Sequence, residues 1–287
     1  MRAIGFNTPL PITDDNSLVD IDLPRPTPAG RDLLVEIKAI SVNPADVKIR
    51  ASARPEGWRV LGWDAAGIVV EAGPEASLYK PGDEVFFAGS ITRPGTYAEF
   101  ALVDERIVGA KPATLGWAEA AALPLTAITA WEALFDRLDV KNRPVPGAAP
   151  AILIIGGAGG VGSIAIQLAR KLTDLTVIAT ASRPETKTWA ADLGAHHVVD
   201  HSRPLAKEIA ALGIGAPAFV FSTTNTDQHL AEIVELIAPQ GRFALIDDPA
   251  ALDINPFKRN SVSAHWEFMF TRSMFGTADM AEQGALL

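Results

Sequence analysis

Apolar and polar positions along this 287-residue chain change their spacing near Pro124. Before that point, short apolar runs such as Leu33 to Ile40, Gly67 to Val70 and Glu84 to Phe87 are separated by Gly and Pro residues. Short strands with turn residues between them predict a mostly β domain.

Beyond Pro124 the pattern alternates between strand and helix. Residues Ala151 to Ile155 form an apolar strand, and the apolar residues from Val161 to Leu168 recur with helical spacing. Further strand-like runs follow at Thr176 to Thr180, His197 to Val199, Phe219 to Phe221 and Arg242 to Ile246. Strands separated by helices form parallel βαβ units with right-handed crossovers. The expected fold class is therefore α/β, with a doubly wound parallel sheet after an N-terminal mostly-β domain.

A different pattern covers Ser261 to Phe270. Apolar residues occupy every second position there, at Val262, Ala264, Trp266, Phe268 and Phe270. This period of two predicts a half-buried strand, which we place at the edge of the sheet. Because an apolar edge is usually covered or paired, the pattern favours a homodimer joined through this strand.

The domain boundary is expected at Leu123-Pro124, just before a helical segment through Trp131. The segment Asp139 to Pro150 is rich in Pro, Gly and Ala, so we interpret it as the loop that enters the first strand of the sheet. This gives residues 1–124 as the mostly-β domain and 125–272 as the doubly wound domain. Residues 273–287 then begin a return to the first domain.

Composition narrows the class of protein. Hydrophobic residues make up 48% and charged residues 21% of the chain, which is typical of a folded globular protein. The absence of cysteine excludes disulfides and thiolate metal sites, and it is consistent with a reducing, cytoplasmic location. The net charge of −9 is repelled by phosphate, which argues against nucleic acid as a partner.

One uncharged stretch, Ala148 to Ala169, is long enough to cross a membrane. Its glycines are clustered in one block, however, and it contains Pro150. A strand, a tight turn and a helix explain this arrangement better than a membrane span. The N-terminus also lacks the apolar core of a signal peptide. We therefore expect no membrane partner.

The glycine block carries the most specific local motif. Gly157, Gly159 and Gly162 satisfy G-x-G-x-x-G after an apolar strand and at the start of a helix, which is the context that the motif requires. Such glycines allow a tight turn, a close approach of backbone to a pyrophosphate, and close helix–strand packing. The motif predicts a nicotinamide dinucleotide site formed by Gly157, Ala158, Gly159, Gly160, Val161 and Gly162. The alternative is a structural turn without a ligand.

The end of the second strand indicates which dinucleotide is bound. Enzymes that use NAD place a carboxylate there, but this chain has Thr180, Ser182 and Arg183, with Lys187 one turn into the next helix. A hydroxyl and two cations suit a 2′-phosphate, so NADPH is the expected cofactor. Alternatively, the two cations are ordinary solvated residues, and Glu185 could pair with Arg183.

With these motifs in place, the sequence resembles the medium-chain dehydrogenase/reductase superfamily, in its zinc-free quinone oxidoreductase branch. The resemblance covers nearly the whole chain and rests on the glycine turn and on six further segments: Ser41 to Asp46, Gly62 to Gly67, Pro81 to Val85, Gly95 to Glu99, Ala121 to Thr126, and Gly194 to His201. It implies a GroES-like catalytic domain at 1–124 and a Rossmann domain at 125–272. It also implies a longer C-terminal return than residues 273–287 provide, so we expect the first domain to be incomplete.

The resemblance is to proteins often labelled as zinc-binding alcohol dehydrogenases, but the zinc ligands are replaced. The zinc enzymes have Cys where this chain has Asn43, and His-Glu where it has Trp63-Asp64. The five histidines form no pair with a carboxylate at ligand spacing. We therefore expect no metal.

Further site residues follow from the resemblance. In the first domain, Asn43 and Asp46 are expected beside the reaction, with Arg50 as an ion-pair partner of Asp46. Asp64 is either catalytic or structural, Asn43-Pro44 could be a plain turn, and Trp63 either shapes a substrate pocket or packs in the core. In the second domain, the resemblance places Thr129 and His201 beside the cofactor. The ends of the fourth and fifth strands carry Ser222, Thr223, Ile246 and Asp247, and we expect these residues to line the nicotinamide channel because such folds bind ligands at the carboxyl ends of their strands.

Without a metal to stabilise an alkoxide, hydride transfer favours acceptors whose negative charge delocalises. The expected function is NADPH-dependent reduction of a quinone or an α,β-unsaturated carbonyl (an enone). Two alternatives are an NADPH-binding protein with little turnover and a zinc-dependent alcohol dehydrogenase. The sequence does not identify the natural substrate.

Overall fold

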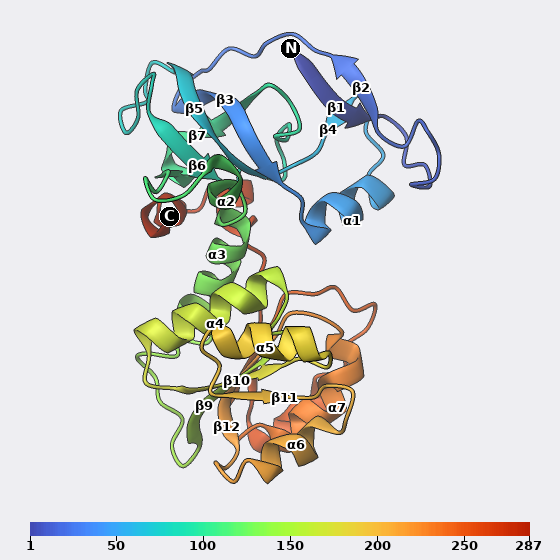
Figure 1. The fold of residues 1–287 in the computed structure, drawn as a ribbon, viewed down its shortest axis with the longest axis vertical. Helices are drawn as coiled ribbons and strands as arrows, with labels where there is room; N and C mark the ends of the chain where they lie inside the picture. The colour runs from blue at the N-terminus through green and yellow to red at the C-terminus, as the bar shows by residue number, and fades with distance from the viewer. The chain divides into compact units, whose positions relative to one another are not determined.

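The computed structural model describes all residues from Met1 to Leu287, and these form two compact units (Figure 1). Unit 1 comprises Met1–Ile128 and Met269–Leu287, and unit 2 comprises Thr129–Phe268. Helix α3 (Pro124–Trp131) contains the first passage between the units. The division between the units falls after Ile128, four residues beyond the expected boundary at 124. The chain returns to unit 1 at Met269, whereas the expected return began at 273.

Unit 1 is the expected mostly-β domain. Its five-stranded antiparallel sheet has the order β7-β3-β5-β6-β8, and a three-stranded sheet has the order β2-β1-β4. The strands of the larger sheet are β3 (Asp32–Ser41), β5 (Asp64–Ala72), β6 (Glu84–Phe87), β7 (Phe100–Asp104) and β8 (Val108–Ala110). The smaller sheet contains β1 (Arg2–Phe6), β2 (Val19–Asp22) and β4 (Arg59–Val60). The helices of this unit besides α3 are α1 (Pro44–Ser52), α2 (Trp117–Ala121), α8 (Thr271–Phe275) and α9 (Glu282–Leu286).

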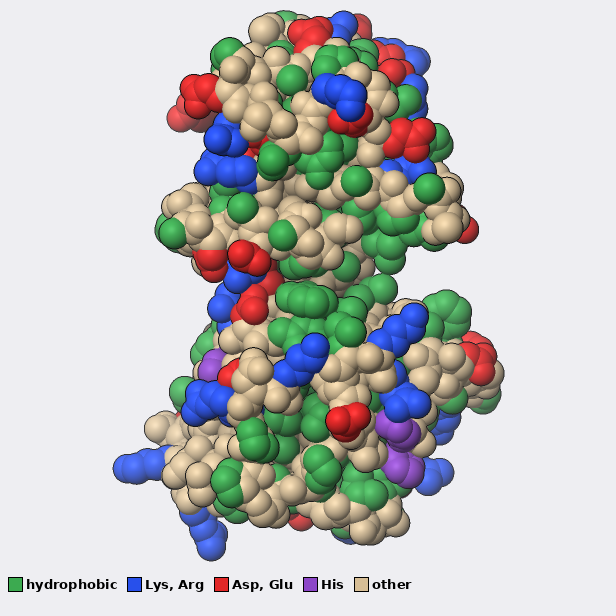
Figure 2. Space-filling view, turned by 90° about the vertical axis from the view of Figure 1, so that its left-hand side faces the viewer, with side chains coloured by type: hydrophobic (Ala, Val, Ile, Leu, Met, Phe, Trp, Pro, Cys, Tyr) green, Lys and Arg blue, Asp and Glu red, His purple; other side chains and the backbone are tan.

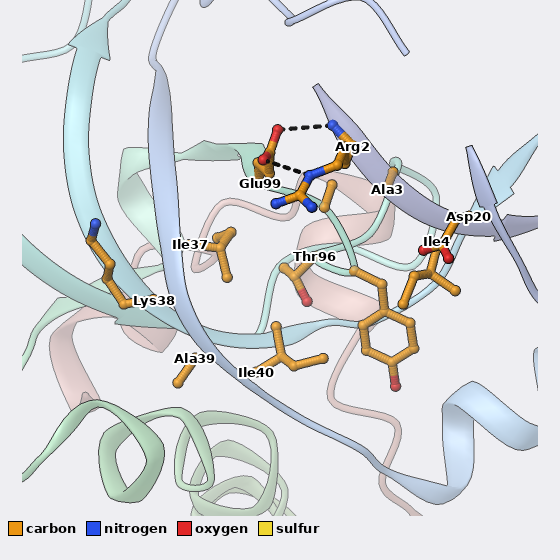
Figure 3. A pocket seen from close by; sticks show the side chains of 12 residues that line it. Arg2, Ala3, Ile4, Asp20, Ile37, Lys38, Ala39, Ile40, Thr96 and Glu99 are labelled. Atoms are coloured by element: carbon orange, nitrogen blue, oxygen red, sulfur yellow. Dashed lines mark hydrogen bonds and ion pairs between the residues drawn. The ribbon is translucent and has the colours of Figure 1, made fainter. Parts of the chain in front are cut away.

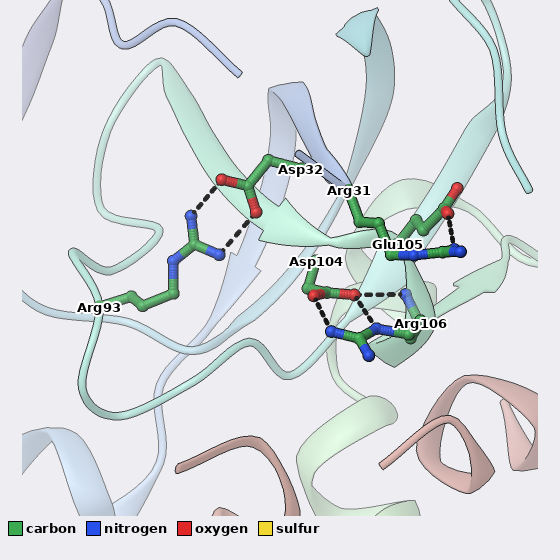
Figure 4. A network of polar contacts seen from close by, with 6 residues as sticks. All are labelled: Arg31, Asp32, Arg93, Asp104, Glu105 and Arg106. Carbon is green, nitrogen blue, oxygen red and sulfur yellow. Dashed lines mark hydrogen bonds and ion pairs between the residues drawn. The ribbon is translucent and has the colours of Figure 1, made fainter. Parts of the chain in front are cut away.

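Ion pairs hold the loops at one end of the larger sheet (Figure 4). Arg93 donates to both carboxylate oxygens of Asp32, each at 2.8 Å, and Arg31 donates to Glu105 at 2.7 Å. Glu105 is fully buried, and its other oxygen accepts from the backbone amides of residues 77 and 78, each at 2.7 Å. This buried carboxylate is stable because every part of it has a hydrogen-bonding partner.

Unit 2 is a six-stranded parallel sheet with the order β11-β10-β9-β12-β13-β14. The strands are β9 (Ala149–Ile155), β10 (Thr176–Thr180), β11 (His197–Val199), β12 (Pro217–Ser222), β13 (Arg242–Leu245) and β14 (Ser263–Trp266). The helices are α4 (Gly160–Leu172), α5 (Pro184–Asp192), α6 (Leu205–Ala211) and α7 (Thr226–Leu236), and a π-helix covers Glu132–Arg137. The strand order reverses between β9 and β12, which is where doubly wound folds bind ligands.

Helices cover both faces of this sheet because its central strands are apolar on both sides. Ile152 and Ile154 of β9 pack in one core cluster, together with Ile166 of α4. Leu153 of the same strand packs in a second cluster with Ile233 of α7. The continuous apolar run predicted for a buried parallel strand is thus confirmed.

The edge strand differs from its prediction. β14 does lie at the sheet edge, but it ends at Trp266, and the alternation of buried residues reverses there. Trp266 and Phe268 are 53% and 46% exposed, whereas Glu267 is buried. Glu267 is buried because Arg137 donates to its carboxylate at 2.8 Å, which the apolar pattern could not reveal.

The uncharged stretch at 148–169 is divided between β9 and α4, as expected for a strand, turn and helix. None of the helices combines the length and the apolar character needed to span a bilayer. Figure 2 shows charged side chains of both signs on the visible face.

Candidate functional site

The glycine turn connects β9 to α4 in unit 2. The backbone amide of Gly156 donates to the side-chain oxygen of Thr180 at 3.0 Å, and the amide of Gly157 donates to the Thr180 carbonyl at 3.1 Å. The turn is thus fastened to the end of β10 by two bonds. Gly159 has an extended backbone, and α4 begins at Gly160. The first amides of this 13-residue helix have no partners within the helix, so they can receive an anion.

Close packing or backbone conformation explains why three positions of the turn are glycine. A Cβ on Gly157 would lie 2.7 Å from the Cβ of Ala179, and a Cβ on Gly162 would lie 2.3 Å from the Gly156 carbonyl oxygen. Gly156 has a φ of +78°, which other residues rarely adopt. Gly159 differs because it is exposed and its nearest contact would be 3.3 Å away. The turn therefore packs tightly on its inner side and leaves its outer side open.

The expected residues at the end of β10 lie together, but each cation already has a partner. Ser182 is half-buried. Arg183 is exposed and pairs with Glu185 at 2.9 Å. Lys187 pairs with Asp200 at 2.8 Å, and this contact lowers the pKa of the Asp200 carboxyl. No role was predicted for Asp200, although that residue belongs to the segment Gly194 to His201 that supported the resemblance.

His201 lies at the same end of the sheet. Its Nδ1 is 3.2 Å from the Thr180 hydroxyl, which is also the acceptor for Gly156. Its ring lies 6.2 Å from that of His229, edge to face. Burial is the main cause that lowers the pKa of His229. Thr180 therefore links the glycine turn to His201.

Residues at the ends of β12 and β13 form a second polar group. The hydroxyls of Ser222 and Thr226 are 2.8 Å apart, and Thr226 donates to Asp247 from its amide and its hydroxyl. Thr223 donates from its hydroxyl to the Ile155 carbonyl at 2.8 Å. Thr226 has a central place in this group, and no motif in the sequence predicted it.

Two further expected residues of unit 2, Ile246 and Thr129, are partly or almost wholly buried. Ile246 is half-buried after the end of β13, and its amide donates to the Ser222 carbonyl at 3.3 Å. Thr129 is 5% exposed on α3.

Unit 1 contains a separate, buried polar cluster around Asn43 and Asp64. Asn43 precedes α1, and its side-chain Nδ2 donates to Asp64 Oδ2 at 2.9 Å. The other oxygen of Asp64 accepts from the backbone amide of Leu125 at 2.8 Å. Asp64 is completely buried, and this burial raises its pKa to about 7. Asn43 is therefore held in a fixed orientation by Asp64.

Asp46 is held by backbone and not by Arg50. Its carboxylate accepts from the amides of Asn43 at 2.7 Å and Gly62 at 2.9 Å. Arg50 donates instead to the Leu10 carbonyl at 2.7 Å, so the expected ion pair is wrong. Burial raises the pKa of Asp46, and the amide bonds partly oppose that rise.

Trp63 lies in the core of unit 1. Its side chain is 1% exposed, and its ring packs edge to face against Phe270 at 5.9 Å. A ring that is almost wholly enclosed favours core packing over a substrate pocket as the role of Trp63.

A shallow cavity of about 380 Å³ lies elsewhere in unit 1, between β1, β3 and the loop at 96–99 (Figure 3). It is lined by apolar side chains, among them Ile4, Ile37 and Ile40, and by Tyr97. The Tyr97 hydroxyl is buried without a hydrogen bond, and burial together with Asp46 raises its pKa. Tyr97 was part of the segment that supported the resemblance, but no role was predicted for it.

The residues of unit 1 do not fit a catalytic zinc. Such a site needs three converging ligands of the N, O or S type. Asn43 directs its amide nitrogen at Asp64, and Trp63 is enclosed in the core. No three His, Cys, Asp or Glu side chains in the structure are arranged to hold a metal.

Comparison with known proteins agrees with this architecture. The model of the alcohol dehydrogenase GroES-like domain matches residues 29–113, and that of the zinc-binding dehydrogenase matches residues 160–284. A zinc-type alcohol dehydrogenase-like protein of Staphylococcus aureus is 41% identical over 99% of this chain and 84% of its own length. The quinone oxidoreductase of Mus musculus is 30% identical over 82% of this chain and 70% of its own length.

Among solved structures, a Rhizobium etli CFN 42 protein assigned by name to the zinc-dependent alcohol dehydrogenases is 73% identical, with a TM-score of 0.99. The alignment covers 100% of this chain and 84% of that one. A GroES-like β unit joined to a Rossmann unit defines an oxidoreductase of two domains. The chain belongs to the medium-chain dehydrogenase/reductase superfamily, among relatives that include zinc-type alcohol dehydrogenase-like proteins and quinone oxidoreductases.

Proposed function

We propose that this chain is an NADPH-dependent reductase of quinones or α,β-unsaturated carbonyls and that it works without a metal. The observation that carries the proposal is the glycine turn, which is fastened to Thr180 and open on its outer side. The pyrophosphate would bind at the turn and at the start of α4. Ser182, Arg183, Lys187 and His201 would contact the 2′-phosphate, and the cofactor supplies the hydride.

The buried cluster of unit 1 supplies the second part of the proposal. An amide nitrogen carries two hydrogens, and only one of those on Asn43 is needed for Asp64. The other can be donated to a substrate oxygen that gains negative charge. Asp64 and Asp46 act as positioning residues, because they orient the Asn43 side chain and its backbone. A delocalised acceptor needs only such donors, which favours a quinone or an enone. The name of the mouse relative supports the quinone.

The direct test is to mix protein, NADPH and a small quinone and to follow the nicotinamide absorbance. We expect oxidation of NADPH that a chelator does not slow. Replacing Asn43 by alanine should lower kcat/KM about 10- to 100-fold, because one donor to the developing charge is lost. The Kd for NADPH should stay within about twofold.

Asn142, an exposed residue of unit 2, provides a matched control, since Asn142→Ala removes an amide far from both groups in sequence. It should behave like the wild type. NADPH binding without oxidation of NADPH by any quinone or enone would contradict the reductase proposal. Loss of activity with a chelator would contradict the metal-free mechanism.

The exposed part of the edge strand supports a homodimer. β14 lies at the free edge of the sheet, and Trp266 is 53% exposed on it. We expect Trp266→Glu to shift the protein from dimer to monomer in sedimentation at micromolar concentration, because a charge would enter an apolar interface. Trp58→Glu is the control, since Trp58 is 47% exposed but lies in unit 1. A wild-type protein that is monomeric at every concentration would contradict the dimer.

A further inference from the structure

Three of the four expected ligands of a 2′-phosphate are already engaged in this structure. Arg183 pairs with Glu185, Lys187 pairs with Asp200, and the His201 ring is hydrogen-bonded to Thr180. Of these partners, Asp200 is the most firmly fixed. Its Oδ2 accepts from Lys187 at 2.8 Å, and its Oδ1 accepts from the amide and hydroxyl of Ser202 at 3.0 and 2.6 Å.

The position of Asp200 gives this contact its significance. β11 runs parallel to β10, with Val199 paired to Thr180, so Asp200 follows directly after the end of the neighbouring strand. In enzymes that use NAD, a carboxylate at the end of the second strand binds the ribose 2′-hydroxyl. Here the second strand lacks one, and the carboxylate of the third strand is held against Lys187.

A phosphate at this place must compete with Asp200. If Lys187 turns to the phosphate, it loses its contact with the Asp200 carboxylate. The phosphate then lies close to the negative charge of Asp200. The 13% exposure of the Asp200 side chain limits the screening of that charge by solvent. A 2′-hydroxyl carries no charge and meets neither difficulty.

We propose that Asp200 restrains the choice of cofactor: by pairing with Lys187 it weakens binding of the 2′-phosphate, so that the site takes both NADPH and NADH with a modest preference for NADPH. The inference rests on the proposed dinucleotide site of unit 2. Asp200 acts through Lys187 and is therefore a positioning residue in cofactor selection.

Two nucleotide fragments, 2′,5′-ADP and 5′-AMP, separate the effect on the phosphate from the effect on the rest of the site. Calorimetry on the full chain should show that Asp200→Asn binds 2′,5′-ADP about two- to fivefold more tightly than the wild type, as expected for one partly exposed charge pair. Binding of 5′-AMP should change less than about twofold. The asparagine keeps an acceptor for Ser202, which preserves the turn.

Two further variants identify the cause. Asp192→Asn removes an exposed charge at the last residue of α5, and it should leave both affinities unchanged. The double variant Asp200→Asn with Lys187→Met should bind 2′,5′-ADP no better than Lys187→Met alone, because the gain requires a released lysine. Thermal unfolding of each variant checks that the fold is intact.

The outcomes distinguish a failure of the inference on Asp200 from a failure of the proposed function. If Asp200→Asn changes both fragments equally or neither of them, Asp200 does not restrain cofactor choice, and the inference is wrong while the dinucleotide site stands. If the gain persists without Lys187, the coupling is wrong in the same way. If the wild type binds neither fragment nor NADPH, the proposed function fails, and the inference fails with it.

Discussion

Replacing Gly162 by alanine is expected to lower the affinity for NADPH by at least about 100-fold. A Cβ at this position would lie 2.3 Å from the Gly156 carbonyl oxygen and 2.8 Å from Gly157 Cα, and both of these atoms are backbone. Neither can move without displacing the turn that would bind the pyrophosphate. A misplacement of about 1 Å in a preorganised site can cost about 100-fold. Fluorescence titration with NADPH measures the loss.

Gly57→Ala is the matched control for this change. A Cβ on Gly57 would meet nothing within 4 Å, so alanine there should leave affinity unchanged. Thermal unfolding should show a lower Tm for Gly162→Ala, because the packing of α4 on the turn is disturbed. An unchanged Kd for NADPH in Gly162→Ala would mean that the turn does not hold the cofactor.

The second large effect concerns Asp64 and pH. Burial raises the pKa of Asp64 from 3.8 to about 7, so the folded protein retains a proton that the unfolded chain releases near pH 4. The free energy of unfolding therefore falls as pH rises from about 4 to about 7, and it levels off above that range. At 1.36 kcal/mol for each pH unit, the fall amounts to roughly 4 kcal/mol.

Chemical denaturation between pH 4 and pH 8 tests this expectation by comparing wild type with Asp64→Asn. The asparagine amide does not titrate, so the free energy of unfolding of the variant should lack the pH-dependent contribution of Asp64. The variant should be less stable than wild type at pH 4, because one of the donors from Asn43 and Leu125 then lacks an acceptor. The difference should shrink or reverse by pH 8. Asp15→Asn, at an exposed position, should keep the wild-type slope, whereas equal slopes for all three proteins would refute the assignment.

The sequence predicted features that depend on local patterns. The strands of unit 2 were found because buried parallel strands are continuous apolar runs, and the glycine turn was found because its spacing reflects local packing. The alternation of strands and helices was then enough to predict the doubly wound sheet.

Features that depend on distant partners were missed. Glu267 is buried and accepts from Arg137, 130 residues earlier, whereas Trp266 is exposed, so the pattern of the edge strand predicted the wrong burial for Trp266. The partner of Arg50 is a carbonyl 40 residues away. Lys187 and Asp200 are 13 residues apart and meet because β11 lies next to β10. Such contacts are set by the assembled fold and leave no periodic signal.

The division of unit 1 between two stretches of chain has a consequence for biosynthesis. Met269 and Phe270 pack with Phe6 and Trp63 in one core, yet they are translated after the whole of unit 2. On the ribosome, the Rossmann unit has all its strands available while the β unit still exposes apolar side chains. The core around Phe6 and Trp63 is therefore completed only after all strands of unit 2 have been synthesised.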